Sequence, residues 1–353
     1  MWKSCSRRDS VGTLRVKRRH LGLEKKPHMG RNVQNWGRLQ PRVVSVSQLT
    51  SLIEIELPTG AQIPIVRRRL GGSRSGKRVA IVAGIRGDAP EGIRVALLLA
   101  RFLEAHADAL DGTVDIYPCA NPLAAERGQR RWPFFDIDLN RRFPGRPDGH
   151  PPDQVAHALC QDIRGSDQVI ELRGARPSFR EVAQAHVRAG DDDAASVAEG
   201  ANVSVVWMRT PGPAAPTTFP YQFPGSIVLE GGSGNRLTPD ISRDLCNGLL
   251  NMLSSLGVFP EQFLPFHWAT LHRPSRVTDS DVSRVRASRS GLFMPLGSVW
   301  GSVEQGDVLG EVIDPASGAL LESVCSPVSG HLLAVREHPA VFPGTMVARV
   351  VQA

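Results

Sequence analysis

The sequence predicts an α/β protein whose sheet is covered by helices on both faces, followed by a small glycine-rich β domain. Between about residues 41 and 260, short apolar runs typical of buried strands alternate with longer runs of helical periodicity, as in α/β sheets. After 260, short apolar pairs, frequent glycines and closely spaced turns are typical of a compact β region. The chain of 353 residues also exceeds the usual size of a single core, so a large and a smaller domain are expected.

The individual elements follow from local pattern. RVAIVAG at residues 78–84 predicts a buried strand, and residues 90–110 predict a helix with Pro90 in its first turn, where proline removes no hydrogen bond. Further strands are expected at 113–122, 168–174, 203–208 and 226–232, and further helices at 153–163 and 241–256. Ligands bind beyond the carboxyl ends of strands in such sheets, so we expect the functional site there.

Charge is concentrated at the amino-terminal end. Residues 1–40 hold 11 of the 42 Lys and Arg but 2 of the 35 Asp and Glu, a net charge of +9 that leaves −2 for the rest. This segment lacks apolar periodicity and the apolar core of a secretory signal, so we expect a basic, disordered tail. Three interpretations stay open: an arm for an acidic partner, a transit-like sequence, or an over-extended start with the true initiator at Met29.

Composition excludes several classes of protein. The folded body is not basic, which argues against a nucleic-acid partner, and no apolar run approaches the roughly 18 residues of a membrane span. The five cysteines show no paired spacing, so neither a disulfide framework nor a thiolate metal site is expected. A reducing cytoplasm is the expected location.

Three familiar motifs fail in their context. GGSRSGK at residues 71–77 has phosphate-loop spacing, but Arg78 replaces the Ser or Thr that would meet magnesium, and a strand follows, so a turn between two strands is expected. GGSG at 231–234 lacks the Gly-x-Ser-x-Gly elbow of serine hydrolases. The carboxyl-terminal turns are similar to those of biotinyl and lipoyl carriers, yet no lysine occurs after Lys77, which excludes covalent carriage of a cofactor.

Several segments occur in the order of a known family: GIRGDAPEG, NPLAAERGQRRWPFFDIDLNRRFPG, VIELRG and IVLEGG, then a glycine-rich end. From Val43 onward the chain thus resembles the succinylglutamate desuccinylase/aspartoacylase family, relatives of zinc carboxypeptidases. Residues 121–145 match best, because Arg130, Asp138, Asn140 and Arg141 keep the family spacing. The resemblance implies a carboxypeptidase-like mixed sheet.

The resemblance also implies a zinc site that this chain has lost. In the family, a His-Gly-x-Glu pair and a later His hold the zinc that activates water for attack on an N-acyl amide. The matching positions here are Arg86, Ala89 and Arg173. An arginine is always protonated and offers no lone pair, so a degenerate zinc site is expected, with no metal and no other cofactor.

The remaining family positions are retained. The resemblance implies Glu230 as general acid or base, Arg130 as the group that steadies an oxyanion, and Asn140 with Arg141 as the grip on a substrate carboxylate. A guanidinium holds a carboxylate through two parallel hydrogen bonds. With Arg86 and Arg173 added, we expect an arginine-rich pocket whose partner is a small anionic carboxylate.

Alternatives remain at this point. Arg86 and Arg173 either bind an anion or form ion pairs with Glu230, Asp88 or Glu171. The histidines of the α/β region offer no ligand pair, and His186 is expected on the surface. The rim loop at 209–225 either contributes contacts through Tyr221 or Gln222 or is a connector.

Three functions follow. The first is a metal-free family member, a pseudoenzyme in the zinc sense, that binds an N-acyl amino acid or similar carboxylate. The second is a metal-independent acyl-transfer or lyase enzyme with Glu230 as base. The third is a zinc-dependent N-acyl amino acid amidohydrolase with unrecognised ligands.

Overall fold

The computed structural model describes residues 49–71, 76–265 and 274–352. The expected tail at 1–40 lies outside these residues, as does most of the expected turn at 71–77. No helix in the described segments has the length and apolar character needed to cross a membrane.

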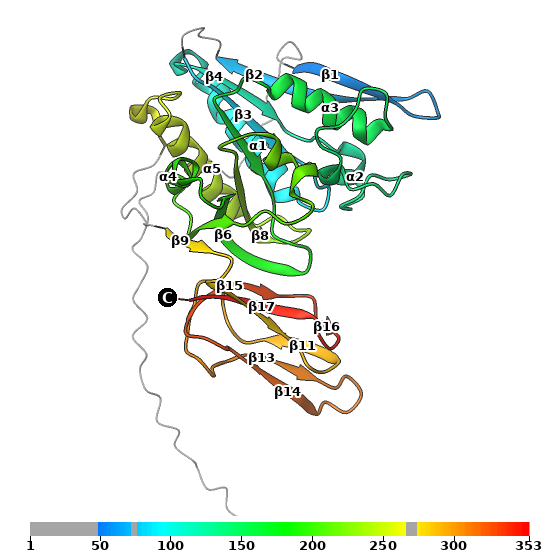
Figure 1. Ribbon diagram of the computed structural model, residues 1–353, viewed down its shortest axis with the longest axis vertical. Coiled ribbons are helices and arrows are strands. Elements are labelled where there is room, and N and C mark those ends of the chain that lie inside the picture. The colour runs from blue at the N-terminus through cyan, green and yellow to red at the C-terminus, as the bar shows by residue number, and fades with distance from the viewer. Residues whose placement is uncertain (1–48, 72–75, 266–273, 353) are drawn as a thin grey trace, which may run out of the picture. The chain divides into compact units, whose positions relative to one another are not determined.

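The predicted α/β architecture is confirmed for the larger region (Figure 1). Its strands are β1 (Leu49–Glu56), β2 (Gln62–Gly71), β3 (Arg78–Ala83), β4 (Thr113–Tyr117), β5 (Gln168–Leu172), β6 (Phe179–Arg188), β7 (Val205–Arg209), β8 (Ile227–Ser233) and β9 (Ser275–Thr278). Its helices are α1 (Pro90–Ala105), α2 (Pro122–Glu126), α3 (Pro151–Ile163), α4 (Asp192–Glu199) and α5 (Pro239–Ser255).

One mixed sheet runs through this region in the order β1-β2-β4-β3-β5-β8-β6, and β7 pairs with β6 and β9. Strands β4, β3, β5 and β8 are parallel to one another, while β6 is antiparallel to β8 and parallel to β7. The parallel strands are buried on both faces, which explains their continuous apolar sequences.

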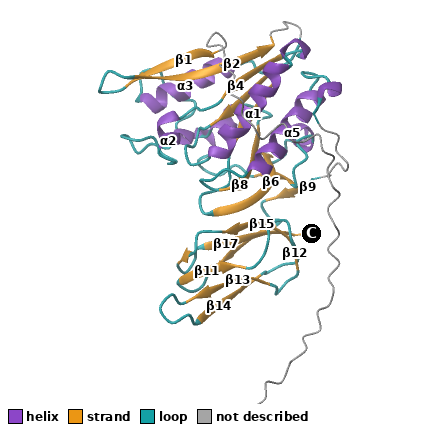
Figure 2. Ribbon diagram, turned by 180° about the vertical axis from the view of Figure 1, so that it is seen from behind, coloured by secondary structure: helices purple, strands orange, loops and turns teal. Residues whose placement is uncertain are grey.

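Helices cover both faces of the sheet (Figure 2). Ala80 and Val82 of β3 share one apolar cluster with Leu159 of α3. Side chains alternate along a strand, so Val79 and Ile81 face the opposite side, where α1 contacts β3, β5 and α5. The two buried faces are the core that holds the strand ends in place.

Strand β6 and helix α4 were not expected from the sequence. The β6 segment carries Glu181, Gln184 and His186, all buried, so it lacks the apolar run that marked the other strands. Of these three side chains, His186 lines the cavity described below, and Gln184 donates Nε2 to the carboxylate of Glu181 at 3.0 Å. Local periodicity therefore missed the strand that contributes most new residues to that site.

The carboxyl-terminal region is made of strands, as predicted: β10 (Val282–Arg286), β11 (Gly291–Pro295), β12 (Ser302–Val303), β13 (Val308–Ile313), β14 (Leu320–Cys325), β15 (Gly330–Arg336), β16 (Ala340–Val341) and β17 (Met346–Gln352). Four of them form a separate sheet in the order β14-β13-β11-β16. Strand β15 instead pairs with β6, so the large sheet continues into β17 and β10 (Figure 1). A domain boundary near residue 260 stays a prediction.

Candidate functional site

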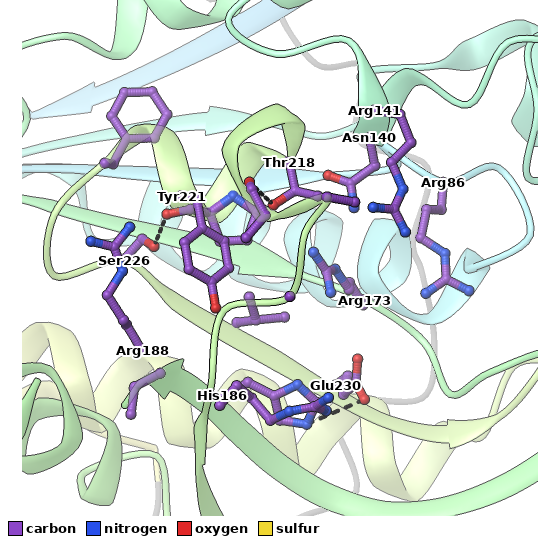
Figure 3. A pocket seen from close by; sticks show the side chains of 18 of the residues that line it. Arg86, Asn140, Arg141, Arg173, His186, Arg188, Thr218, Tyr221, Ser226 and Glu230 are labelled. Carbon is purple, nitrogen blue, oxygen red and sulfur yellow. Dashed lines mark hydrogen bonds and ion pairs between the residues drawn. The ribbon is translucent and has the colours of Figure 1, made fainter. Parts of the chain in front are cut away.

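A cavity of about 600 Å³ opens at the carboxyl ends of the parallel strands (Figure 3). Arg86 follows β3, Arg173 follows β5 directly, and Glu230 follows Leu229, the last residue of β8 that pairs with β5. These three strands are adjacent and parallel, which brings their ends together at one edge of the sheet. All six residues singled out by the sequence line this cavity: Arg86, Arg130, Asn140, Arg141, Arg173 and Glu230.

Asp138 organises one wall of the cavity. One carboxylate oxygen accepts the backbone N–H of Asn140 at 3.1 Å, and the other accepts Nε of Arg130 at 2.8 Å. The second oxygen also lies 3.9 Å from Nε of Arg141, whose side chain is 46% exposed. The ion pair between Arg141 and Asp138 is therefore weak, and the Arg141 guanidinium is available to a ligand.

Asn140 connects this wall to the loop above it. Its side-chain oxygen accepts the backbone N–H of Phe219 at 3.1 Å, which leaves the amide NH₂ group as a donor. In the same loop Tyr221 lines the cavity, so a contact from this residue to a ligand stays a prediction. Gln222 instead donates Nε2 to the carbonyls of Pro216 and Thr218, so it braces the loop.

Arg86 is 7% exposed and lies beside a buried acid. Its Nε donates to Oδ1 of Asp88 at 3.3 Å. Its Nη2 is buried and has no hydrogen-bond partner among the described residues. A buried donor without a partner costs about 1–3 kcal/mol, so this atom favours an acceptor supplied by a ligand or water.

Arg173 makes a closer pair. Its Nε and Nη2 donate to the two carboxylate oxygens of Glu171, each at 2.6 Å. Glu171 thus holds the guanidinium at the cavity wall in the bidentate geometry that carboxylates favour. Two of the ion pairs considered from the sequence, with Asp88 and with Glu171, are present, and both arginines nevertheless line the cavity.

Glu230 lies 3.4 Å from His186, measured from Oε1 to Nε2, and both side chains are buried. Burial by itself would raise the Glu230 pKa, but His186, Arg173, Arg176 and Arg86 hold it below its usual range, so the carboxylate is ionised at neutral pH. Burial lowers the His186 pKa to about 4, so its imidazole is neutral there.

The expectation that His186 lies on the surface is wrong, since this residue lines the cavity from β6 and is 9% exposed. Its ring packs edge-on against Trp207 of β7 at 5.4 Å between ring centroids. The available signal was the strand-length run at 179–188, bounded by Pro177-Ser178 before it and Ala189-Gly190 after it.

Three further arginines, Arg176, Arg188 and Arg209, line the cavity and were missed by the sequence. The guanidinium of Arg188 lies over the Tyr221 ring at 4.8 Å, at the end of the cavity away from Arg86 (Figure 3). Arg209 pairs with Asp279 at 3.0 Å. The cavity is thus lined by seven arginines and by two acidic residues, Asp191 and Glu230, so positive groups predominate in its lining.

These donors do not fit a zinc ion. Zinc requires neutral imidazole, thiolate or carboxylate ligands, and a guanidinium supplies no lone pair. Within the described segments, no group of three His, Cys, Asp or Glu side chains is placed to hold a metal. His186 and Glu230 form a pair without a third ligand of this kind.

Comparison with known proteins identifies relatives. The Succinylglutamate desuccinylase/Aspartoacylase catalytic domain profile matches residues 75–256. A curated protein, N-alpha-acetyl-L-2,4-diaminobutyric acid deacetylase of Halomonas elongata, is 24% identical over 283 residues, which cover 75% of this chain and 79% of that protein.

Several solved structures have a similar fold. A succinylglutamate desuccinylase/aspartoacylase from Rhodobacter sphaeroides is 22% identical with a TM-score of 0.71, and the match covers 85% of this chain and 93% of that one. The product-bound ectoine utilization protein EutE (DoeB) from Ruegeria pomeroyi is 20% identical with a TM-score of 0.71, over 85% of this chain and 93% of its own. At these identities the similarity shows a shared fold.

Proposed function

Because the chain belongs to the succinylglutamate desuccinylase/aspartoacylase family, we propose that it binds an anionic N-acyl amino acid or a similar carboxylate without zinc-dependent hydrolysis. In this proposal Arg86, Ala89 and Arg173 occupy the family's zinc-ligand positions. Their side chains leave the metal without a donor, while the part of the site that recognises a carboxylate is retained.

The observation that carries the proposal is the charge of the cavity, seven arginines against two acids in about 600 Å³. Four of the arginines already pair with Asp88, Asp138, Glu171 or Asp279. Three others supply charge without a close acidic partner among the described residues: Arg141, at 3.9 Å from Asp138, and Arg176 and Arg188. An anionic ligand would offset this excess.

The wall beside Asp138 supports a specific mode of binding. The loosely held guanidinium of Arg141 offers two parallel N–H groups, and Asn140 offers its NH₂ group next to it. Arg130 and Glu230 line the same cavity and are therefore available to the acyl group of such a ligand. The curated relative is named for an N-acetylated amino acid, which supports the same ligand class here.

A second function is supported by the state of Glu230. The arginines hold this buried carboxylate ionised, as a general base requires, and could stabilise a developing oxyanion in place of a metal. A metal-independent acyl transfer or elimination would use the same cavity. The pKa of the Glu230 carboxyl lies far below neutral pH, however, so this carboxylate is a weak base. Binding without turnover therefore remains the first proposal.

The test is calorimetric titration of purified protein with N-acetylglycine and succinate, with N-acetylglycinamide as the neutral matched control. The two acids should bind and the amide should not, and affinity should fall as salt rises, because part of the attraction is screened. A turnover screen of the same compounds, with Glu230→Gln beside the wild type, addresses the second function. Amide hydrolysis that a chelator abolishes, or equal affinity for acid and amide, would contradict the proposal.

A further inference from the structure

His186 and Glu230 form a buried acid–base pair in the wall of the cavity, separated by 3.4 Å between Nε2 and Oε1 (Figure 3). Nε2 is buried and makes no hydrogen bond within the described residues. The imidazole packs edge-on against the Trp207 ring, which restricts its movement. His186 thus lines the cavity, while its Nε2 faces the Glu230 carboxylate without a hydrogen bond to it or to any other described residue.

The charges facing His186 come from every element around it. Glu230 on β8 is the negative one, and Arg173 and Arg176 after β5 and Arg209 at the end of β7 are positive. On its own strand lie Glu181 and Arg188, and β17 contributes Arg349, whose guanidinium lies over Trp207 at 5.5 Å and 3.8 Å from Glu181. Positive charges outnumber negative ones, so they oppose a proton on the imidazole.

We propose that His186 takes up one proton from solvent when an anionic ligand enters the cavity, and that the resulting imidazolium pairs with Glu230 and the ligand. This inference rests on the proposed function, because it requires an anion in the cavity. It assigns to His186 the role of a ligand-contacting proton acceptor and to Glu230 that of its partner. No bond other than the new N–H on the imidazole is formed or broken.

The physical reason is that a bound anion reverses the local balance of charge. Burial, together with the surrounding arginines and against the opposing effect of Glu230, holds the pKa of His186 at about 4, so the imidazole is neutral. A negative charge within about 4–6 Å raises such a pKa by about 1 to 3. In the complex, His186 would therefore titrate between about pH 5 and 7, while Glu230 stays ionised and supports the imidazolium.

The experiment is calorimetric titration with N-acetylglycine at about pH 6 in several buffers of different ionisation enthalpy. The carboxylate of this probe, with a pKa of about 3.5, is ionised throughout, so any proton exchanged belongs to the protein. The slope of the observed binding enthalpy against the ionisation enthalpy of the buffer gives the number of protons taken up per ligand bound. We expect about 0.5 proton per ligand in the wild type at about pH 6 and close to none at about pH 8.

His186→Gln should still bind N-acetylglycine. For this variant the slope of observed enthalpy against buffer ionisation enthalpy should be near zero at both pH values. His338→Asn, which changes an exposed histidine outside the cavity, should keep the wild-type slope. Binding by the wild type with zero slope at about pH 6 overturns the inference without any variant, so the test survives if His186→Gln fails to fold. A wild-type slope in a folded His186→Gln protein also overturns it, because the proton would then be taken up by another group of the protein. If N-acetylglycine does not bind at all, the proposed function fails and the inference fails with it.

Discussion

Arg173 and Glu171, two residues apart at the end of β5, are joined by two hydrogen bonds of 2.6 Å between guanidinium and carboxylate. The Glu171 side chain is 1% exposed, so its charge is not solvated by water and depends on Arg173 for compensation. The arginine at the cavity wall therefore stabilises the fold as well as the charge of the site. Any change at position 173 must be judged with its partner.

Arg173→Gln should lower the free energy of unfolding by about 3–5 kcal/mol, because it leaves a buried carboxylate unpaired. The double variant Arg173→Gln with Glu171→Gln should recover most of this loss, since no buried charge remains. Urea denaturation of both measures the difference. Arg131→Gln is the control, because its pair with Asp136 is exposed and should contribute less than about 1 kcal/mol. Equal losses in the single and double variants would show that the pair contributes nothing specific.

Arg141→Ala should weaken binding of N-acetylglycine by about tenfold or more, because it removes a charge-assisted contact of about 1.5–3 kcal/mol. The melting temperature should hardly change, since the side chain is half exposed and only loosely paired. Calorimetric titration gives the affinity, and Arg146→Ala, an exposed arginine outside the cavity, is the matched control. Unchanged affinity in Arg141→Ala would remove this residue from the ligand site.

The wild-type protein should purify without stoichiometric zinc, and chelators should leave its melting temperature unchanged. The reason is chemical, since Arg86 and Arg173 offer no lone pair. Elemental analysis and thermal denaturation with and without chelator are the measurements. One tightly bound zinc per chain after ordinary purification would contradict this prediction. It would support a zinc-dependent N-acyl amino acid amidohydrolase instead.

If positions 86, 89 and 173 correspond to the family's zinc ligands, as proposed, placing His, Glu and His there should create zinc binding, because the surrounding fold is that of the family. The substitutions are Arg86→His, Ala89→Glu and Arg173→His. Asp88→Asn and Glu171→Gln belong with them, since each of these buried acids loses its arginine partner. Zinc uptake is measured by calorimetry, with the two companion substitutions alone as control. A folded variant without zinc affinity would show that the local geometry has diverged from the family's.

Stability should fall as pH decreases from about 6.5 to about 4 by an amount that depends on His186. The unfolded chain binds a proton at this residue below about pH 6.5, whereas the native pKa is about 4, so acid favours the unfolded state in that window. The contribution is of order 3 kcal/mol. Urea denaturation across this range should show a flatter profile for His186→Gln than for the wild type. Parallel profiles would place the native pKa of His186 near its ordinary value.

Much of the fold was predictable because its determinants are local. The parallel strands are buried on both faces, and their sequences are therefore continuous apolar runs. The helical spacing of apolar residues and Pro90 in the first turn predict α1. Strand β6 escaped the same reasoning, since its buried face carries Glu181, Gln184 and His186. A polar strand is stable here only because partners from β8 and β17 surround it, and periodicity does not contain that information.

The sequence by itself determined the family and the residue types at the candidate site, among them Arg86 and Arg173. Only the tertiary structure decided what those residues do to one another. It paired Arg173 with Glu171, left Nη2 of Arg86 unbonded, and placed His186 beside Glu230. The physical reason is that charge interactions act over a few ångströms in space between residues that can be far apart along the chain, so the sign, pairing and burial of each group depend on neighbours that only the folded sheet assembles.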